Sequence, residues 1–215
     1  MDLNKANKYI NDLYSKHGVD QDEYIKLTKL REYGHIIDRD VSLMMQVLLS
    51  LNNPKLILEI GTSIGYSTVS MAEIIKEYNG KIITIESDKQ VAMQAIENFK
   101  HMGVADYIEV KIGDAQKILP KMTGEFDVIF QDVGDKTLYS ILLNDCIRLL
   151  KNNGLLLAED TLFPIMDRFK HYHESIASIH KFNEMVSSNP DLISTIIPIG
   201  DGLTVSIKKN DNLGK

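Results

Sequence analysis

The sequence predicts an α/β fold built on a mostly parallel, seven-stranded sheet with helices on both faces. From Lys55 onward, short apolar runs alternate with helical stretches, a pattern typical of βαβ units whose parallel sheet is covered on both sides. The last two of the seven apolar runs are joined by Gly200-Asp201-Gly202, a turn that suits an antiparallel hairpin. We therefore expect a parallel sheet that ends in an antiparallel C-terminal pair.

Size and charge limit the classes of protein that the chain can belong to. Its 215 residues, 44% hydrophobic and 25% charged, fit a single domain with a proper core. The net charge of −6 disfavours a broad basic face for nucleic acid. No apolar run approaches the roughly 20 residues that cross a bilayer, and the N-terminus lacks a signal-peptide core. Cys146, the single cysteine, excludes an internal disulfide, and we expect it to be buried in a cytoplasmic protein.

Three helices are expected before the first strand. Apolar residues recur at helical spacing from Leu3 to Leu13, a second helix is expected over residues 22–33, and a third carries an apolar stripe from Val41 to Leu48. The third helix should stop before Asn52-Asn53-Pro54. We accordingly divide the chain into an N-terminal helical segment, residues 1–52, and a core, residues 53–210.

The elements of the core follow in order. The expected strands are LILEI, KIITIE, IEVKI, FDVIFQD, GLLLAED, STIIPIG and LTVSIKK. The expected helices cover residues 66–78, 89–101, 138–150 and 165–186. Ligands of such sheets bind at the carboxyl ends of the strands. The residues at these ends are mostly acidic, and they are Glu59, Gly61, Glu86, Gly113, Asp114, Asp132, Glu159 and Asp160.

The turn after the first strand reads GTSIG, from Gly61 to Gly65. A dinucleotide fingerprint needs G-x-G-x-x-G, and a phosphate loop needs Gly-Lys-Ser/Thr, so neither is present. A ring of carboxylates repels a pyrophosphate but suits a cationic ligand. S-adenosylmethionine (SAM) carries a sulfonium, and Glu86, 25 residues beyond Gly61, could accept hydrogen bonds from its ribose diol. We expect a SAM site; a plain tight turn followed by an acidic strand end is the alternative.

Several blocks resemble the cation-dependent class I O-methyltransferases, which include catechol and caffeoyl-CoA O-methyltransferases and small bacterial relatives. LEIGTSIGYS matches the family's Leu-Glu-Ile-Gly-Thr, two variable residues, then Gly-Tyr-Ser, and TIESD, IGDA, KNNGLLLAEDTLF and IIPIGDGLTVSIKK match later blocks in order. The likeness runs from about Ile36 to Lys209, and NPDLISTIIPIGDGL resembles the bacterial subgroup that contains tRNA 5-hydroxyuridine methyltransferases. The resemblance implies a Rossmann-like SAM methyltransferase, with the N-terminal helices as lid and homodimer element.

The resemblance also implies a set of SAM-binding residues. The backbone at Gly61 would approach the methionine moiety, Ser67 would bind its carboxylate from a helix start, and Glu86 would hold the ribose. Asp114 and Ala115 would border the adenine. The full expected set is Glu59, Gly61, Thr62, Gly65, Tyr66, Ser67, Glu86, Ser87, Gly113, Asp114, Ala115, Asp132 and Tyr139.

The stretch FDVIFQDVGDKTLY holds the expected catalytic residues, Asp132 and Lys136. The family pattern is Phe-Ile-Asp, two residues, a lysine, and a tyrosine three residues on; its aspartate binds a metal and its lysine can act as base. By resemblance, Asp132, Glu159 and Asp160 would hold a divalent cation, Mg²⁺ or alternatively Mn²⁺ or Ca²⁺. Such a cation lowers the pKa of a phenol-like hydroxyl, and Lys136 could then take its proton.

Two departures from the family pattern leave alternatives open. One extra residue separates Asp132 from Lys136, and Glu159-Asp160 replaces the family's Asp-Asn. Lys136 could be displaced, Asp135 could become the first ligand, or the metal site could be lost. The favoured function is metal-assisted O-methylation of a small catechol- or phenol-like acceptor, or of a hydroxylated tRNA nucleoside. A SAM-binding protein without transferase activity is a competing class, and a nucleotide-dependent oxidoreductase is disfavoured by the missing third glycine.

Overall fold

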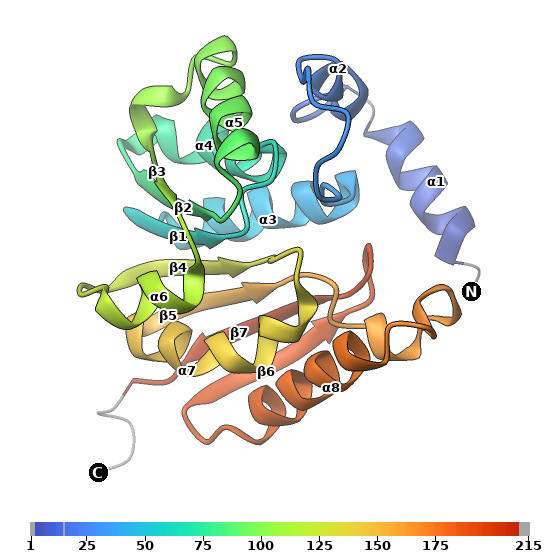
Figure 1. Cartoon of the computed structure of the whole chain (residues 1–215), viewed down its shortest axis with the longest axis vertical. Helices are drawn as coiled ribbons and strands as arrows, with labels where there is room; N and C mark the ends of the chain where they lie inside the picture. Colours follow the sequence, from blue (N-terminus) through green and yellow to red (C-terminus); the bar gives the residue numbers. More distant parts are fainter. Residues whose placement is uncertain (1–2, 15, 211–215) are drawn as a thin grey trace.

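The computed structural model describes residues 3–14 and 16–210, and its centre is a seven-stranded sheet (Figure 1). The strands are β1 (Leu56–Ile60), β2 (Lys81–Glu86), β3 (Ile108–Ile112), β4 (Phe126–Gln131), β5 (Leu150–Ala158), β6 (Leu192–Ile197) and β7 (Leu203–Lys208). Their order is β3-β2-β1-β4-β5-β7-β6. The first five strands pair in parallel, whereas β7 pairs antiparallel with both β5 and β6. The predicted fold class and the C-terminal hairpin are confirmed.

Helices cover both faces of the sheet (Figure 1). Two apolar cores form where these helices pack on the sheet. One face carries α3 (Arg39–Asn52), α4 (Tyr66–Ile75) and α5 (Lys89–His101); the other carries α6 (Ala115–Ile118), α7 (Tyr139–Leu149) and α8 (His173–Ser188). Short 3-10 turns are η1 (Lys76–Tyr78), η2 (Ala105–Tyr107), η3 (Leu119–Lys121), η4 (Lys136–Leu138), η5 (Phe163–Ile165) and η6 (Asp167–Phe169). Ile57 enters one core and Leu58 the other, because successive strand residues point to opposite faces.

The N-terminal segment contributes to the first of these cores. It contains α1 (Leu3–Leu13), α2 (Gln21–Ile25) and α3, and residues 1, 2 and 15 lie outside the described part. Val41 and Met45 of α3 are fully buried, and the Tyr24 hydroxyl donates to the Ile64 carbonyl at 2.9 Å. Cys146 is fully buried, as expected. Across residues 3–14 and 16–210, no helix is both long enough and apolar enough to cross a membrane.

Two predicted helices differ from those in the structure. The helix expected over residues 22–33 ends at Ile25, because the residues that follow pack against other parts of the fold. There the Lys29 amide donates to Gln94 Oε1 at 3.0 Å, and Leu27 and Tyr33 pack against the first core. These tertiary contacts override the local helical preference.

The helix expected over residues 165–186 begins only at His173. The chain before it forms η5 and η6, and the rings of Phe163 and Phe169 stack with 3.8 Å between their centroids. The aromatic packing holds this segment as short turns instead of a continuous helix.

The order of the strands reverses between β1 and β4, and this reversal locates the ligand crevice. Gly61 stands at this point with φ +102, and a Cβ placed on it would lie 2.0 Å from the carbonyl oxygen of Asp132. Only glycine allows the ends of β1 and β4 to approach so closely in this backbone conformation.

Candidate active site

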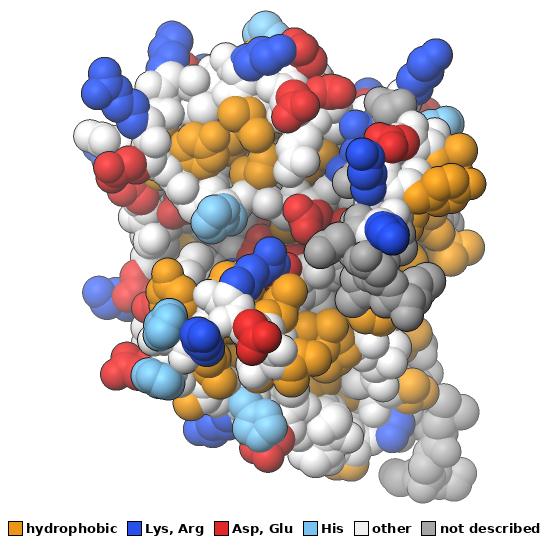
Figure 2. Space-filling view, turned by 90° about the vertical axis from the view of Figure 1, so that its right-hand side faces the viewer, with side chains coloured by type: hydrophobic (Ala, Val, Ile, Leu, Met, Phe, Trp, Pro, Cys, Tyr) orange, Lys and Arg blue, Asp and Glu red, His pale blue; other side chains and the backbone are white. Residues whose placement is uncertain are grey.

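A cavity of about 910 Å³ lies at the carboxyl ends of β1, β2, β4 and β5. Figure 2 looks onto this face and shows acidic side chains in and around the hollow. The predicted residues that border the cavity are Gly61, Glu86, Ser87, Asp132, Lys136, Glu159 and Asp160. Nine Asp and Glu side chains line it, and Lys136 and Arg168 are the only Lys or Arg among the described lining residues. The lining is therefore strongly negative.

Nine residues of the predicted SAM set do not border this cavity: Glu59, Thr62, Gly65, Tyr66, Ser67, Gly113, Asp114, Ala115 and Tyr139. Several of them hold neighbouring backbone in place. The Tyr66 hydroxyl donates to the Val19 carbonyl at 3.1 Å, and Asp114 caps α6 by accepting from the Gln116 amide at 2.9 Å. The Gly113 amide donates to the Glu86 carbonyl at 2.8 Å, which ties the ends of β2 and β3 together.

Glu59 lies fully buried beneath the glycine turn and accepts hydrogen bonds from three hydroxyl groups. Ser67 Oγ and Thr84 Oγ1 each donate at 2.6 Å, and Thr68 Oγ1 is the third donor. The hydroxyls of Thr62 and Thr84 lie 2.6 Å apart. Burial raises the pKa of Glu59 from 4.5 to about 7, although the three hydroxyls oppose this shift. Glu59 therefore joins β1, β2 and the start of α4 under the turn.

We expect Glu59 to make the free energy of unfolding depend on pH. Between pH 4.5 and about 7, folded Glu59 keeps a proton that the unfolded chain has lost, so stability falls as pH rises through this window. At about 1.36 kcal/mol per pKa unit, the total loss is roughly 3 kcal/mol. Glu59→Gln carries no titrating proton and should flatten this slope. Urea unfolding of both proteins across the window measures the difference, and parallel pH profiles would contradict the assignment.

Glu86 is fixed at the end of β2 by backbone amides. Its Oε2 accepts from the Ser63 amide at 2.9 Å, and its Oε1 accepts from the Asp88 amide at 2.9 Å. The Ser63 amide belongs to the glycine turn, so the turn and the second strand end are linked through this carboxylate. Glu86 also borders the cavity, and a carboxylate oxygen can accept more than one hydrogen bond.

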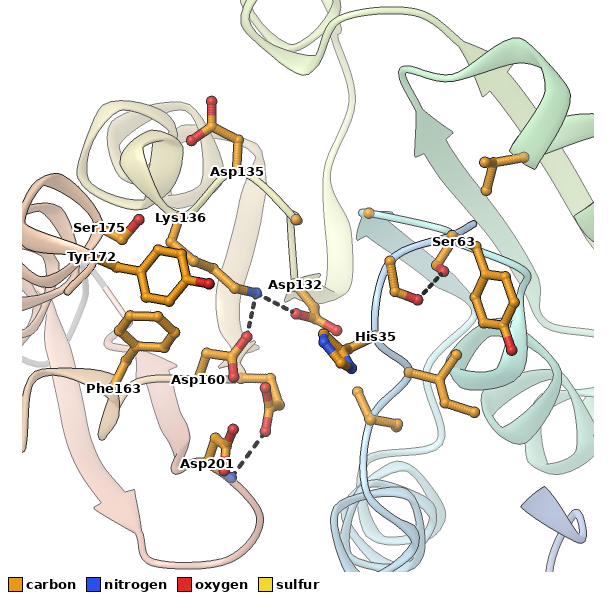
Figure 3. A pocket seen from close by; sticks show the side chains of 18 of the residues that line it. His35, Ser63, Asp132, Asp135, Lys136, Asp160, Phe163, Tyr172, Ser175 and Asp201 are labelled. Carbon is orange, nitrogen blue, oxygen red and sulfur yellow. Dashed lines mark hydrogen bonds and ion pairs between the residues drawn. The ribbon is translucent and has the colours of Figure 1, made fainter. Parts of the chain in front are cut away.

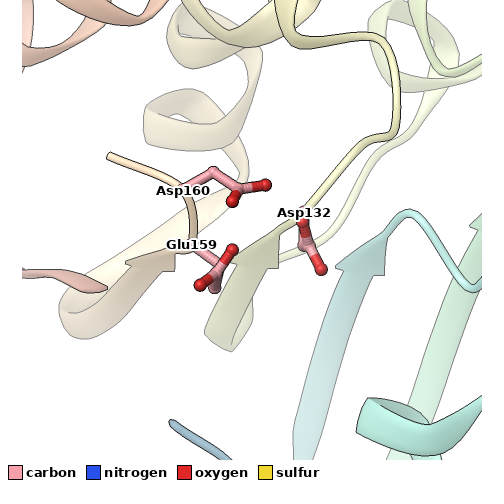
Figure 4. Close-up of side chains that lie close together, drawn as sticks. All are labelled: Asp132, Glu159 and Asp160. Carbon is pink, nitrogen blue, oxygen red and sulfur yellow. The ribbon is translucent and has the colours of Figure 1, made fainter. Parts of the chain in front are cut away.

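Three carboxylates converge at the ends of β4 and β5 (Figure 4). Asp132, Glu159 and Asp160 each offer one oxygen, and these oxygens lie within 4.8 Å of one another. Asp160 has φ +63, a conformation that non-glycine residues rarely adopt and that clusters at functional sites. Burial raises the pKa of Asp132 and of Glu159, and repulsion from Asp160 adds to the rise. Three hard oxygen donors in this arrangement fit a divalent cation such as Mg²⁺.

Lys136 points at this carboxylate cluster instead of into solvent (Figure 3). Its Nζ lies 3.1 Å from Asp132 Oδ1, forms a second ion pair with Asp160 Oδ2, and lies 3.4 Å from the Tyr139 hydroxyl. Burial alone would lower the pKa of Lys136. The neighbouring Tyr139, Asp132 and Asp160 raise it more, so the pKa of Lys136 lies well above its usual value. The extra residue before Lys136 therefore leaves its ammonium group inside the site.

Asp135, the alternative first ligand, is engaged elsewhere. Its Oδ1 accepts from the Thr137 amide at 3.0 Å and from the Thr137 hydroxyl at 2.6 Å, which caps η4. Among the described residues, the group of carboxylates close enough to share a metal ion contains Asp132 instead.

An aromatic wall that the sequence analysis missed borders the cavity beside Lys136 (Figure 3). It consists of the stacked rings of Phe163 and Phe169 together with Tyr172, whose ring centroid lies 6.1 Å from that of Phe163. Arg168 lies 4.7 Å from the Phe169 ring centroid and pairs with Asp201 in the turn between β6 and β7. The position of Phe163 directly after the EDTL block was the one available signal for this wall.

The strand order and the acidic cavity at its reversal define a Rossmann-like methyltransferase fold. The O-methyltransferase TomG from Streptomyces achromogenes, solved in complex with SAM, matches with a TM-score of 0.81 at 22% identity, covering 98% of this chain and 100% of that one. A family model described as O-methyltransferase matches residues 21–209. The chain belongs to this O-methyltransferase family, which confirms the predicted membership.

Two relatives with named activities show the same likeness in sequence. The catechol O-methyltransferase of Niastella koreensis is 31% identical over 176 residues, which are 77% of this chain and 78% of that protein. Caffeoyl-CoA O-methyltransferase 1 of Eucalyptus globulus is 28% identical over 181 residues, which are 77% of this chain and 72% of that protein.

Proposed function

We propose that this protein transfers the methyl group of SAM to a catechol- or phenol-like hydroxyl of a small molecule, with the help of a divalent cation. The observation that carries this proposal is the placement of Glu86 and of the Asp132–Glu159–Asp160 cluster along one cavity. The cavity therefore offers a hydrogen-bond acceptor for a ribose and an oxygen cluster for a cation. Membership of the O-methyltransferase family supports the same reaction.

SAM would occupy the part of the cavity next to Gly61 and Glu86. SAM supplies an electrophilic methyl group on a cationic sulfur, and the negative lining attracts such a cation. Glu86 is held by the Ser63 and Asp88 amides, so little further ordering is needed when it accepts from the ribose hydroxyls.

We expect Glu86→Gln to weaken SAM binding by roughly 1–3 kcal/mol, because the ribose diol loses a charged acceptor. Asp88→Asn is the matched control. Asp88 also borders the cavity, but its carboxylate caps α5 by accepting from the Gln90 amide, and asparagine preserves such a cap. Calorimetric titration with SAM measures both variants. Equal affinities in the folded Glu86→Gln variant and the wild type would remove the ribose assignment.

The acceptor would lie between the carboxylate cluster and the aromatic wall. When bound, a divalent cation at Asp132, Glu159 and Asp160 would lower the pKa of the acceptor hydroxyl. Phe163 and Tyr172 border the cavity on this side, and their rings suit an aromatic acceptor held in a stacked or edge-on arrangement. A fixed orientation of acceptor and methyl donor supplies a large part of the rate in such a transfer.

The charge of the lining favours a small acceptor over a tRNA strand. Nine acidic side chains face two basic ones around the cavity, whereas nucleic-acid binding depends on basic groups that neutralise phosphates. The test is methyl transfer from SAM to catechol, followed by mass spectrometry, with Mg²⁺ and with excess EDTA. A protein that binds no SAM would refute the proposed reaction, and full transfer in EDTA would refute the role of the cation.

A further inference from the structure

The ammonium group of Lys136 lies where a divalent cation would bind. Its Nζ contacts Asp132 Oδ1 at 3.1 Å and pairs with Asp160 Oδ2, and these two residues belong to the oxygen cluster that fits a cation. Figure 3 shows Lys136 reaching across to both carboxylates. The chain therefore supplies its own positive charge to the cluster.

Burial makes this internal pairing strong. The side chains of Lys136, Asp132 and Asp160 are only 13%, 14% and 15% exposed, respectively. Among the described residues, no other Lys or Arg forms an ion pair with Asp132, Glu159 or Asp160. Without Lys136, three adjacent carboxylates would repel one another in a poorly hydrated site.

A bound cation and the Lys136 ammonium group cannot keep the same two carboxylates. A Mg²⁺ ion binds its oxygen ligands at about 2.0–2.1 Å, which would bring it very close to an ammonium nitrogen already paired with the same oxygens. Two positive charges at such a separation repel strongly, particularly where water is scarce. One of them has to leave.

We propose that Lys136 is a built-in competitor of the divalent cation, and that cation binding displaces its ammonium group from Asp132 and Asp160. This inference rests on the cation site of the proposed function. A Cβ added at Gly134, two residues before Lys136, would meet no atom within 4 Å outside its chain neighbours, so the loop is not tightly packed at this point. The competition partly neutralises the cation-free cluster, weakens cation binding, and releases the ammonium group toward the acceptor only when a cation is bound.

The test is calorimetric titration of Mn²⁺ into four proteins: wild type, Lys136→Met, Lys136→Arg and Arg168→Met. Lys136→Met removes the competitor, and we expect its dissociation constant for Mn²⁺ to be at least roughly tenfold lower than that of the wild type. Lys136→Arg keeps the charge and should bind Mn²⁺ about as weakly as the wild type. Arg168→Met is the matched control, since it removes one positive charge from the same cavity but from a residue paired with Asp201.

Equal or weaker Mn²⁺ binding by Lys136→Met would overturn the proposal, as would equal tightening in Arg168→Met, which would indicate only a change in net charge. A structure of the wild type with bound Mn²⁺ provides a test that needs no variant. In it, Lys136 Nζ should lie beyond ion-pair distance from both carboxylates; retention of both pairs beside the ion would overturn the proposal. SAM binding and catechol methylation are measured separately, so failure here leaves the proposed transferase reaction to its own test.

Discussion

Asp160→Gly is expected to lower the rate of methyl transfer at least roughly a hundredfold, the scale seen when an enzyme loses a group that stabilises charge in the transition state. Asp160 supplies one of the three converging oxygens and has φ +63. Glycine adopts that φ without strain, so this variant removes the carboxylate and leaves the backbone conformation intact. Single-turnover rates at saturating SAM, Mg²⁺ and catechol measure the loss, and SAM affinity should stay unchanged.

Asp160→Asn is the informative comparison for this variant. Asparagine keeps an oxygen at the same position and tolerates the left-handed conformation, so it should retain far more activity than Asp160→Gly. The resemblance implies that family members with Asp-Asn in place of Glu159-Asp160 offer the cation an asparagine side-chain oxygen at this second position. If Asp160→Gly transfers methyl groups as fast as the wild type, the carboxylate cluster has no part in the reaction.

Gly61→Ala is expected to destabilise the protein by roughly 3 kcal/mol or more, because overpacking and backbone strain add together. The new Cβ would lie 2.0 Å from the carbonyl oxygen and 2.6 Å from the carbonyl carbon of Asp132. Both are backbone atoms of the residue that directly follows β4, so relief of the clash requires movement of a strand end. Urea unfolding measures the stability, and SAM titration should show weakened binding, since Gly61 borders the cavity.

Gly124→Ala separates the two causes of this loss. Gly124 has φ +110, close to the +102 of Gly61, but a Cβ added there would meet no atom within 4 Å. The Gly124→Ala variant should therefore lose only about 1 kcal/mol of unfolding free energy, which is the cost of placing alanine at a positive φ. Equal losses in the two variants would show that the approach of β1 and β4 has no special requirement for glycine at position 61.

Local patterns in the sequence were sufficient for most of the sheet. The central strands β1 and β4 are short apolar runs, and burial on both faces explains why these two runs are almost continuous. The length of the second N-terminal helix was overestimated, since the residues that follow Ile25 pack on the first core instead of continuing the helix. Periodicity reports a helix-compatible stretch, but it carries no information about distant partners such as Gln94.

The candidate site also contains some features that the sequence could predict and others that it could not. The acids at strand ends could be predicted, because a parallel sheet brings all its carboxyl ends to one edge. The roles of Glu59 and of the aromatic wall could not, since each depends on contacts between separate elements. Glu59 is enclosed by hydroxyls from β2 and α4, and Phe163 borders the cavity only because its segment folds into short turns.

The sequence by itself determined the α/β class, the O-methyltransferase family and the acidic residues at the strand ends, because each is written in a contiguous stretch of chain. Only the tertiary structure decided that Lys136 reaches Asp132 and Asp160 despite the extra residue before it. That outcome depends on how β4 and β5 align and on the left-handed turn at Asp160. The direction in which the Lys136 side chain points follows from strand pairing and packing between separate elements, which no local sequence pattern encodes.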